Sequence, residues 1–169
     1  GLGEREMFVD ENSARIMNTL KSVHFSIADD LIRNNRKEDA VKVLEQARKE
    51  FQYVNAPYYS PNNRFFNILS VQWIDLYYRA DAGAKAKPIK DLFIKDLKDC
   101  IRFYNLPNDF AALYSNEKKS AEELVKRMDM LAFMYKDAEF KKQLYDAFPG
   151  LVQTSTLDPT QPVPMQVFR

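Results

Sequence analysis

The hydrophobic positions from residue 27 to residue 51 follow a helical period that a polar turn interrupts once. Ile27 and Leu31 share one helical face before the turn, and Asn34 and Asn35 form the turn itself. A second series at spacings of three and four residues follows the turn: Ala40, Val43, Leu44, Ala47 and Phe51. This pattern predicts two amphipathic helices joined by a tight connection, which is a helical hairpin.

The first helix of this hairpin is expected to start near Asn12 and to end near Arg33. Asp10 or Asn12 can cap it by accepting hydrogen bonds from the free N–H groups of the first turn. Its predicted core stripe consists of aliphatic side chains at helical spacing: Ile16, Leu20, Val23, Ile27 and Leu31. The polar residues are predicted to face outward, and Lys21 is one of them.

The second helix is expected to open at Asn35, because Glu38 follows three residues later in a pattern close to a capping box. It is expected to end near Gln52, where a loop with two prolines and three asparagines begins. A second hairpin follows, with Pro88 in the first turn of its second helix. Its two predicted stripes are Leu69, Trp73, Leu76, Tyr77 and Ala80, and then Ile89, Phe93, Leu97, Cys100, Ile101 and Tyr104.

The two hairpins form a degenerate repeat that resembles the tetratricopeptide type. Ile27 and Ala40 align with Trp73 and Ala86, in each case 46 positions later in the sequence. This separation exceeds the roughly 34 residues of a standard unit, and the loop between the hairpins accounts for the excess. The pattern predicts an all-α fold in which antiparallel hairpins stack as a short, right-handed, tetratricopeptide-like array.

Additional helices are expected after the repeat. One long helix is predicted from a nearly unbroken heptad series: Ala121, Leu124, Val125, Met128, Leu131, Ala132 and Tyr135. A last helix capped by Asp137 would use Phe140, Leu144, Ala147 and Phe148. The predicted organisation is an extended lead-in over 1–11 with a tag scar at Gly1, a helical-repeat domain over 12–152, and a proline-rich extended tail over 153–169.

The charges are balanced and alternate in sign along the chain. Lys and Arg number 25 against 24 Asp and Glu, so the formal net charge is +1. This balance argues against a nucleic-acid partner, which would need a one-sided excess of cations. No run of 18 apolar residues occurs, so no membrane span is expected in this fragment. The single cysteine, Cys100, excludes an internal disulfide and a cysteine-rich zinc site.

The sequence spells out no constellation for catalysis. His24 is the only histidine, and it lies beside the first predicted stripe, where packing is the simpler interpretation. Adjacent acids such as Asp29 and Asp30 diverge by about 100° on a helix and cannot share a substrate proton. Four glycines are too few for a phosphate-cradling loop. We therefore expect a domain without catalytic residues, cofactor or metal.

One loop combines aromatic faces with amide and guanidinium donors, which suit an extended peptide or a sugar. The candidate binding residues are Tyr58, Tyr59, Asn62, Asn63, Arg64 and Phe65, with Phe66 beside them. The alternative is a loop whose own aromatic rings hold it against Trp73 and Phe51. The sequence leaves both interpretations open.

Three segments carry a resemblance to a known family. They are FVDENSARIMNTL, IADDLIRNNRKEDAVKVLEQARKEF and NAPYYSPNNRFFNILSVQWIDLYYRADAGAKA, in that order. The chain resembles the C-terminal soluble, tetratricopeptide-like region of a family of large bacterial polytopic membrane proteins of unknown function, related to protein O-mannosyltransferases. The resemblance covers roughly the first half of the chain.

The resemblance implies an accessory domain on the periplasmic face of the inner membrane, attached to a glycosyltransferase-like membrane core. The presumed catalytic carboxylate of that family lies in the membrane core, so no catalytic residue is carried over to this chain. The implied partners are an acceptor polypeptide, another protein, or the membrane core of the parent protein. A purely structural domain and a stand-alone tetratricopeptide-like adaptor are the alternatives.

Overall fold

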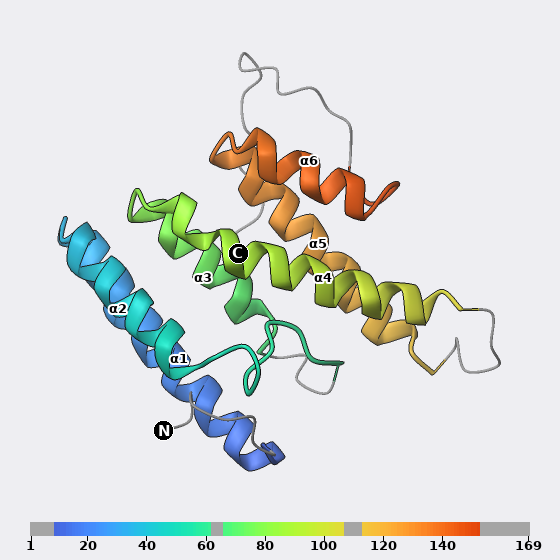
Figure 1. The fold of residues 1–169 in the computed structure, drawn as a ribbon, viewed down its shortest axis with the longest axis horizontal. Helices are drawn as coiled ribbons and strands as arrows, with labels where there is room; N and C mark the ends of the chain where they lie inside the picture. The colour runs from blue at the N-terminus through green and yellow to red at the C-terminus, as the bar shows by residue number, and fades with distance from the viewer. Residues whose placement is uncertain (1–8, 62–65, 107–112, 153–169) are drawn as a thin grey trace.

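The structure, a computed structural model, describes residues 9–61, 66–106 and 113–152, and its regular structure there is helical (Figure 1). The elements are α1 (Glu11–Arg33), α2 (Lys37–Glu50), α3 (Ile68–Arg79), the short 3-10 helix η2 (Gly83–Ala86), α4 (Lys87–Tyr104), α5 (Ser115–Met134) and α6 (Ala138–Ala147). These ranges contain no strand. The predicted all-α class is therefore confirmed for the described residues. The predicted lead-in and tail fall almost entirely outside them.

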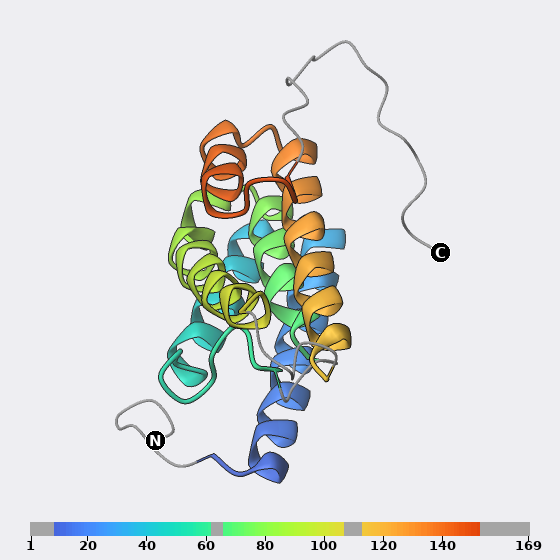
Figure 2. The ribbon, with the colours of Figure 1, turned by 90° about the vertical axis from the view of Figure 1, so that its right-hand side faces the viewer.

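The helices pack as neighbours in chain order. α1 packs against α2 and α3, while α5 contacts both α3 and α4, and α6 contacts α4 and α5. The start of α1 and α6 therefore lie at opposite ends of the molecule, as both views show (Figures 1 and 2). One continuous hydrophobic core runs through all six helices. Its largest fully buried side chains include Phe25, Trp73, Tyr77, Phe93 and Phe140.

Side-chain caps begin α1 and α6, whereas the cap predicted for the second helix is wrong. Asp10 caps α1 as predicted, because its Oδ1 accepts a hydrogen bond from the Ser13 backbone N–H at 3.0 Å. The capping box predicted at Asn35 is wrong. Asn35 has a φ of 58°, the left-handed conformation that asparagine tolerates just after a helix, so it belongs to the turn. The second helix begins instead at Lys37, without a side-chain cap.

Most members of the predicted core stripes are buried in four helices, while Val43, Cys100, Tyr135 and Ala147 are only partly buried. α2 buries Ala40, Leu44 and Ala47; α4 buries Ile89, Phe93, Leu97, Ile101 and Tyr104; α5 buries Ala121, Leu124, Val125, Met128, Leu131 and Ala132; α6 buries Phe140 and Leu144. In α3 the predicted Trp73, Leu76 and Tyr77 are buried as well. Asp137 caps α6 through a bond from the Phe140 N–H at 2.9 Å, as predicted.

The stripe predicted for α1 is wrong. Four of its members are exposed: Ile16 (62%), Leu20 (44%), Val23 (49%) and Ile27 (46%). α1 instead buries Met17, Phe25 and Ala28, together with the polar Asn18 and Lys21, the latter predicted to face outward. The reason is tertiary packing: the Phe25 ring contacts the ring of Trp73 on α3, with centroids 5.2 Å apart. Alanine at position 28, fully buried, lets the helices approach closely.

Gly83, at the start of η2, lies under the ring of Tyr78. A Cβ added at Gly83 would come within 2.6 Å of Tyr78 Cε1. That ring stacks on Tyr135, with centroids 4.4 Å apart and planes 8° apart, and its hydroxyl donates to Asp137 at 2.6 Å. The ring therefore has little freedom to move. We expect Gly83→Ala to destabilise the fold by about 1–3 kcal/mol in urea denaturation. An unchanged midpoint would contradict this packing.

Candidate binding site

The predicted binding loop is only partly within the described residues. Asn62, Asn63, Arg64 and Phe65 lie outside them. Tyr58 and Tyr59 are described, and both are buried, with 4% and 5% of their surface exposed. The Tyr58 ring meets Trp73 edge-on, with centroids 5.9 Å apart, so this part of the loop is held by its own aromatic ring. Binding by the loop as a whole stays a prediction.

His24 is placed by packing on α1 and by contacts to α2. Its Nδ1 lies 2.9 Å from the Leu20 carbonyl oxygen, and its Nε2 lies 3.3 Å from Glu50 Oε2. Its ring meets the Phe51 ring edge-on, with centroids 5.6 Å apart. Among the described residues, no three side chains of the usual metal-ligating types gather at one place.

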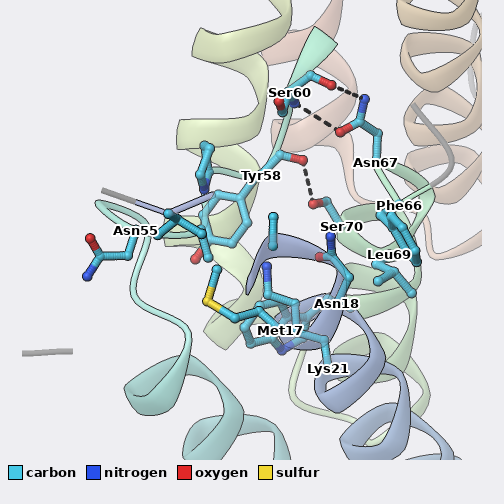
Figure 3. A pocket seen from close by; sticks show the side chains of 15 residues that line it. Met17, Asn18, Lys21, Asn55, Tyr58, Ser60, Phe66, Asn67, Leu69 and Ser70 are labelled. Atoms are coloured by element: carbon cyan, nitrogen blue, oxygen red, sulfur yellow. Dashed lines mark hydrogen bonds between the residues drawn. The ribbon is translucent and has the colours of Figure 1, made fainter. Parts of the chain in front are cut away.

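A cavity of about 190 Å³ lies between the N-terminal half of α1, the loop over 55–60 and the start of α3 (Figure 3). Its wall is partly apolar, through side chains such as Met17, Phe66 and Trp73. The polar side chains in the lining are Asn18, Lys21, Asn55, Ser60, Asn67 and Ser70. Among the described residues, none that lines the cavity carries a carboxylate. The cavity therefore combines an apolar surface, neutral hydrogen-bonding groups and one cationic side chain.

Hydrogen bonds fix the loop to the start of α3 at the edge of this cavity. Ser70 Oγ donates to the Tyr58 carbonyl at 2.7 Å. The Asn67 side chain accepts from the Ser60 N–H and donates to the Ser60 carbonyl, both at 2.9 Å. Figure 3 shows these bonds above the α1 side chains Met17, Asn18 and Lys21. The wall is thus formed before any ligand arrives, and Asn67 and Ser70 are occupied in holding it.

Lys21 is the unusual member of the lining. Only 6% of it is exposed, and no described residue forms a hydrogen bond or ion pair with its ammonium. Its Nζ lies 5.8 Å from the centroid of the Phe51 ring. Burial lowers the pKa of Lys21 from 10.5 to about 8, because leaving water disfavours the charged form. At neutral pH the side chain is therefore mostly charged, and it has no counter-ion in the part of the chain that the structure describes.

Lys90 provides the contrast within the same molecule. It is also 6% exposed, but its Nζ lies 2.9 Å from Asp137 Oδ2 and 3.2 Å from the Tyr78 hydroxyl. The ring centroid of Phe140 lies 4.7 Å from the same nitrogen. A buried lysine in this fold can thus have a full set of partners, and Lys21 does not.

The outward face of α1 is a second candidate. The exposed aliphatic residues Ile16, Leu20, Val23 and Ile27 will be called the outer α1 face. The positions that flank it on one side, Asn12, Thr19 and Ser26, are exposed and uncharged, and the exposed Asp30 follows on the same line near the end of the helix. Contiguous apolar patches of this kind on a protein surface mark contact sites more often than scattered single residues do.

Sequence reasoning missed Lys21 and Asn18 as site residues. Their signal was present, because residues 17, 21, 25 and 28 share a helical face on which a lysine interrupts apolar side chains. Nothing in one sequence, however, indicates that the loop over 55–60 and the start of α3 close over this face. Three segments far apart in the chain form the cavity together.

Within the described ranges, no helix combines the length and the apolar character that a membrane span requires.

Comparison with known proteins does not indicate a function for this chain. No protein-family model matches the chain, and no similar curated protein or solved structure was found.

Proposed function

We propose that this chain is a non-catalytic helical interaction domain in which the outer α1 face pairs with the same face of a second copy. The observation that carries the proposal is the exposure of four large aliphatic side chains on one helix face, each between 44% and 62% exposed. Leaving these side chains in water forgoes roughly 25 cal/mol for each Å² of apolar surface that could be buried. Pairing recovers part of that free energy.

The spacing of the face favours a second copy as the partner. The residues follow one another at intervals of four, three and four, which read the same from either end of the helix. A two-fold axis between residues 21 and 22 would place Ile16 opposite Ile27 and Leu20 opposite Val23. These are the a and d positions of an antiparallel helix pair, and a two-fold interface uses one surface twice.

Charge also favours this partner. The flanking residues Asn12, Thr19 and Ser26 carry no charge, and in the antiparallel pair Asp30 of one copy would lie opposite Ser13 of the other. Two copies can therefore approach without like charges meeting. A strongly acidic or basic partner helix would find little complementary charge along this face. A neutral face that matches itself is the better fit.

In a repeat arrangement, the outer α1 face would lie at the end of the stack of hairpins. We interpret α1–α2 and α3–α4 as two stacked tetratricopeptide-like hairpins, since α1 packs on both α2 and α3. α1 then forms the open end of the stack (Figure 1). Terminal repeats usually carry a polar outer face that keeps the array soluble. An apolar outer face at this position supports a further helix packed against it.

The family resemblance supports a parent protein and a cellular location for such a domain. In this setting the chain belongs to a membrane glycosyltransferase-like protein and lies on the periplasmic face of the inner membrane. Pairing between copies would then hold two membrane cores together, whereas an acceptor polypeptide or the parent's own membrane core would be the alternative partner. Topology mapping of the full-length gene product tests this setting, which fails if the region lies in the cytoplasm.

Leu20→Glu tests the pairing. The substitution places a charge in the middle of an apolar interface, so we expect the dissociation constant of the pair to increase at least about 100-fold in sedimentation equilibrium. Met134→Glu is the matched control, because Met134 is 42% exposed but lies on α5. The control should pair like the wild type. A wild-type chain that stays monomeric, or a Leu20→Glu variant that pairs normally, contradicts the proposal.

A further inference from the structure

We infer that the cavity beside Lys21 binds a carboxylate group, carried by an acidic side chain, a peptide C-terminus or a small carboxylic acid. This site lies on the inner side of α1, so the inference does not depend on pairing through the outer α1 face. It rests on three observations: a lysine whose side chain is largely buried and has no acidic partner among the described residues, neutral donors beside it, and a cavity of limited size.

The first observation concerns the charge. Lys21 is 94% buried, and none of the described residues that line the cavity is acidic. A buried ammonium is unfavourable unless an anion or hydrogen-bond acceptors compensate it. Its neighbour, the Phe51 ring, is a weak substitute at 5.8 Å. Lys90 shows how the same fold compensates a buried lysine with a carboxylate, that of Asp137. An incoming carboxylate would give Lys21 the equivalent partner.

The second observation concerns the neighbouring donors. The Asn18 side chain lines the same cavity, and only 7% of this residue is exposed. Trp73 also lines it, and its indole N–H has no acceptor among the described residues. A carboxylate offers two oxygens and about four acceptor positions, so it can accept from an ammonium and from neutral donors together. One cation beside neutral donors suits a single negative charge better than the double charge of a phosphate group.

The third observation is size. The cavity volume of about 190 Å³ lies below the range of about 300–1,000 Å³ that is usual for sites of whole small-molecule ligands. Met17, Tyr58 and Trp73 supply an apolar wall that can contact the methylene or methyl part of an acid. The site therefore fits one acidic side chain, one chain terminus or a short aliphatic acid.

Nuclear magnetic resonance titration of the ¹⁵N-labelled chain tests the inference. The probes are acetate, a peptide containing one glutamate with both ends blocked, and a neutral peptide with a free C-terminus. Acetamide and inorganic phosphate serve as comparison ligands. We expect saturable shifts at Asn18, Asn55 and Ser70 with at least one carboxylate probe, and no saturable shifts with acetamide. The strongest binder among the three probes identifies the source of the carboxylate.

Two variants make the test specific. Lys21→Met keeps the length of the side chain and removes its charge, so the best carboxylate probe should bind at least tenfold more weakly. Lys49→Met makes the same change at an exposed position of α2 and should bind as the wild type does. Binding that Lys21→Met leaves unchanged would overturn the inference. So would the absence of saturable binding for all three carboxylate probes, or phosphate binding that is tighter than theirs.

Discussion

Replacing Asp137 by alanine is expected to lower the free energy of unfolding by about 3–5 kcal/mol, the largest effect of any single substitution proposed for this chain. The Asp137 carboxylate accepts a hydrogen bond from the Tyr78 hydroxyl and pairs with Lys90, which is 6% exposed. It also caps α6 through the Phe140 N–H. Its removal leaves a buried ammonium without a counter-ion and costs a helix cap as well. Urea denaturation at pH 7 measures the effect.

The Asp137 carboxylate also makes the stability of the fold depend on pH in the acidic range. Burial alone would raise the pKa of Asp137, but hydrogen bonds from Tyr78, the Phe140 N–H and Lys90 outweigh burial and lower it. Because the folded-state pKa lies below the unfolded value, the stabilisation is present above the unfolded pKa and is lost as pH falls through the folded pKa. Asp137→Ala should therefore lose less stability than the wild type between pH 5 and pH 2.

Two further variants separate this effect from a general loss of acidic residues. Asp39→Ala removes an exposed acid that contacts Arg36 and Lys42 on the surface, and it should change stability little. Replacing both partners, with Asp137→Leu and Lys90→Met together, should recover part of the loss, because no buried charge then remains unpaired. If Asp137→Ala unfolds at the same urea concentration as Asp39→Ala, the Lys90 pair has no structural role.

Lys21→Met is expected to stabilise the fold at pH 7 by about 1–3 kcal/mol, an unusual direction for a change at a buried position. Burial lowers the pKa of Lys21 from 10.5 to about 8, and that difference corresponds to about 3 kcal/mol. The folded chain carries this penalty because Lys21 is largely out of water and no described residue pairs with it. Methionine has a similar length and no charge, so it removes the penalty and fills the same space.

The sign of the pH dependence distinguishes this explanation from better packing alone. With a folded-state pKa below the unfolded value, the penalty is fully present below pH 8 and disappears as pH rises from 8 to 10.5. The advantage of Lys21→Met should therefore shrink over that interval. Tyr58, the other titratable side chain in the lining, stays neutral there, because burial raises its pKa to about 12. A constant advantage from pH 7 to pH 10.5 would show that Lys21 is not a buried cation.

The helices that could be predicted are those whose polar and apolar residues separate cleanly. In α4, the predicted stripe with Ile89, Phe93 and Leu97 is buried, so the period and the structure agree, although Lys90 beside the stripe is buried as well. α1 has two apolar faces, and the face with the longer aliphatic series was the one predicted to be buried. The face that is buried contains Lys21, which a hydrophobicity pattern counts against burial. This face is buried because it packs against Trp73 of α3.

Less of the candidate site than of the fold could be predicted from the sequence. Tyr58 was recognised as a candidate, but the structure uses its ring for packing and its carbonyl as an acceptor for Ser70. The aromatic residues of a loop look the same in sequence whether they face a ligand or a core. The cavity depends on α1, a loop and α3 meeting in space, and sequence spacing does not determine that meeting. Lys21 becomes informative only when its lack of partners is visible.

The distance between two copies of α1 tests the proposed interaction domain most directly. Asn12→Cys, combined with Cys100→Ala, allows one spin label near the start of α1 in each copy. Antiparallel pairing about an axis between residues 21 and 22 places the two labelled positions about 30 Å apart along the helices, whereas parallel pairing would place them about 10 Å apart. Electron spin resonance should show a distance near 30 Å that Leu20→Glu abolishes. If the labels show no dipolar coupling in the wild-type chain, the outer α1 face does not pair two copies, and the proposal is wrong.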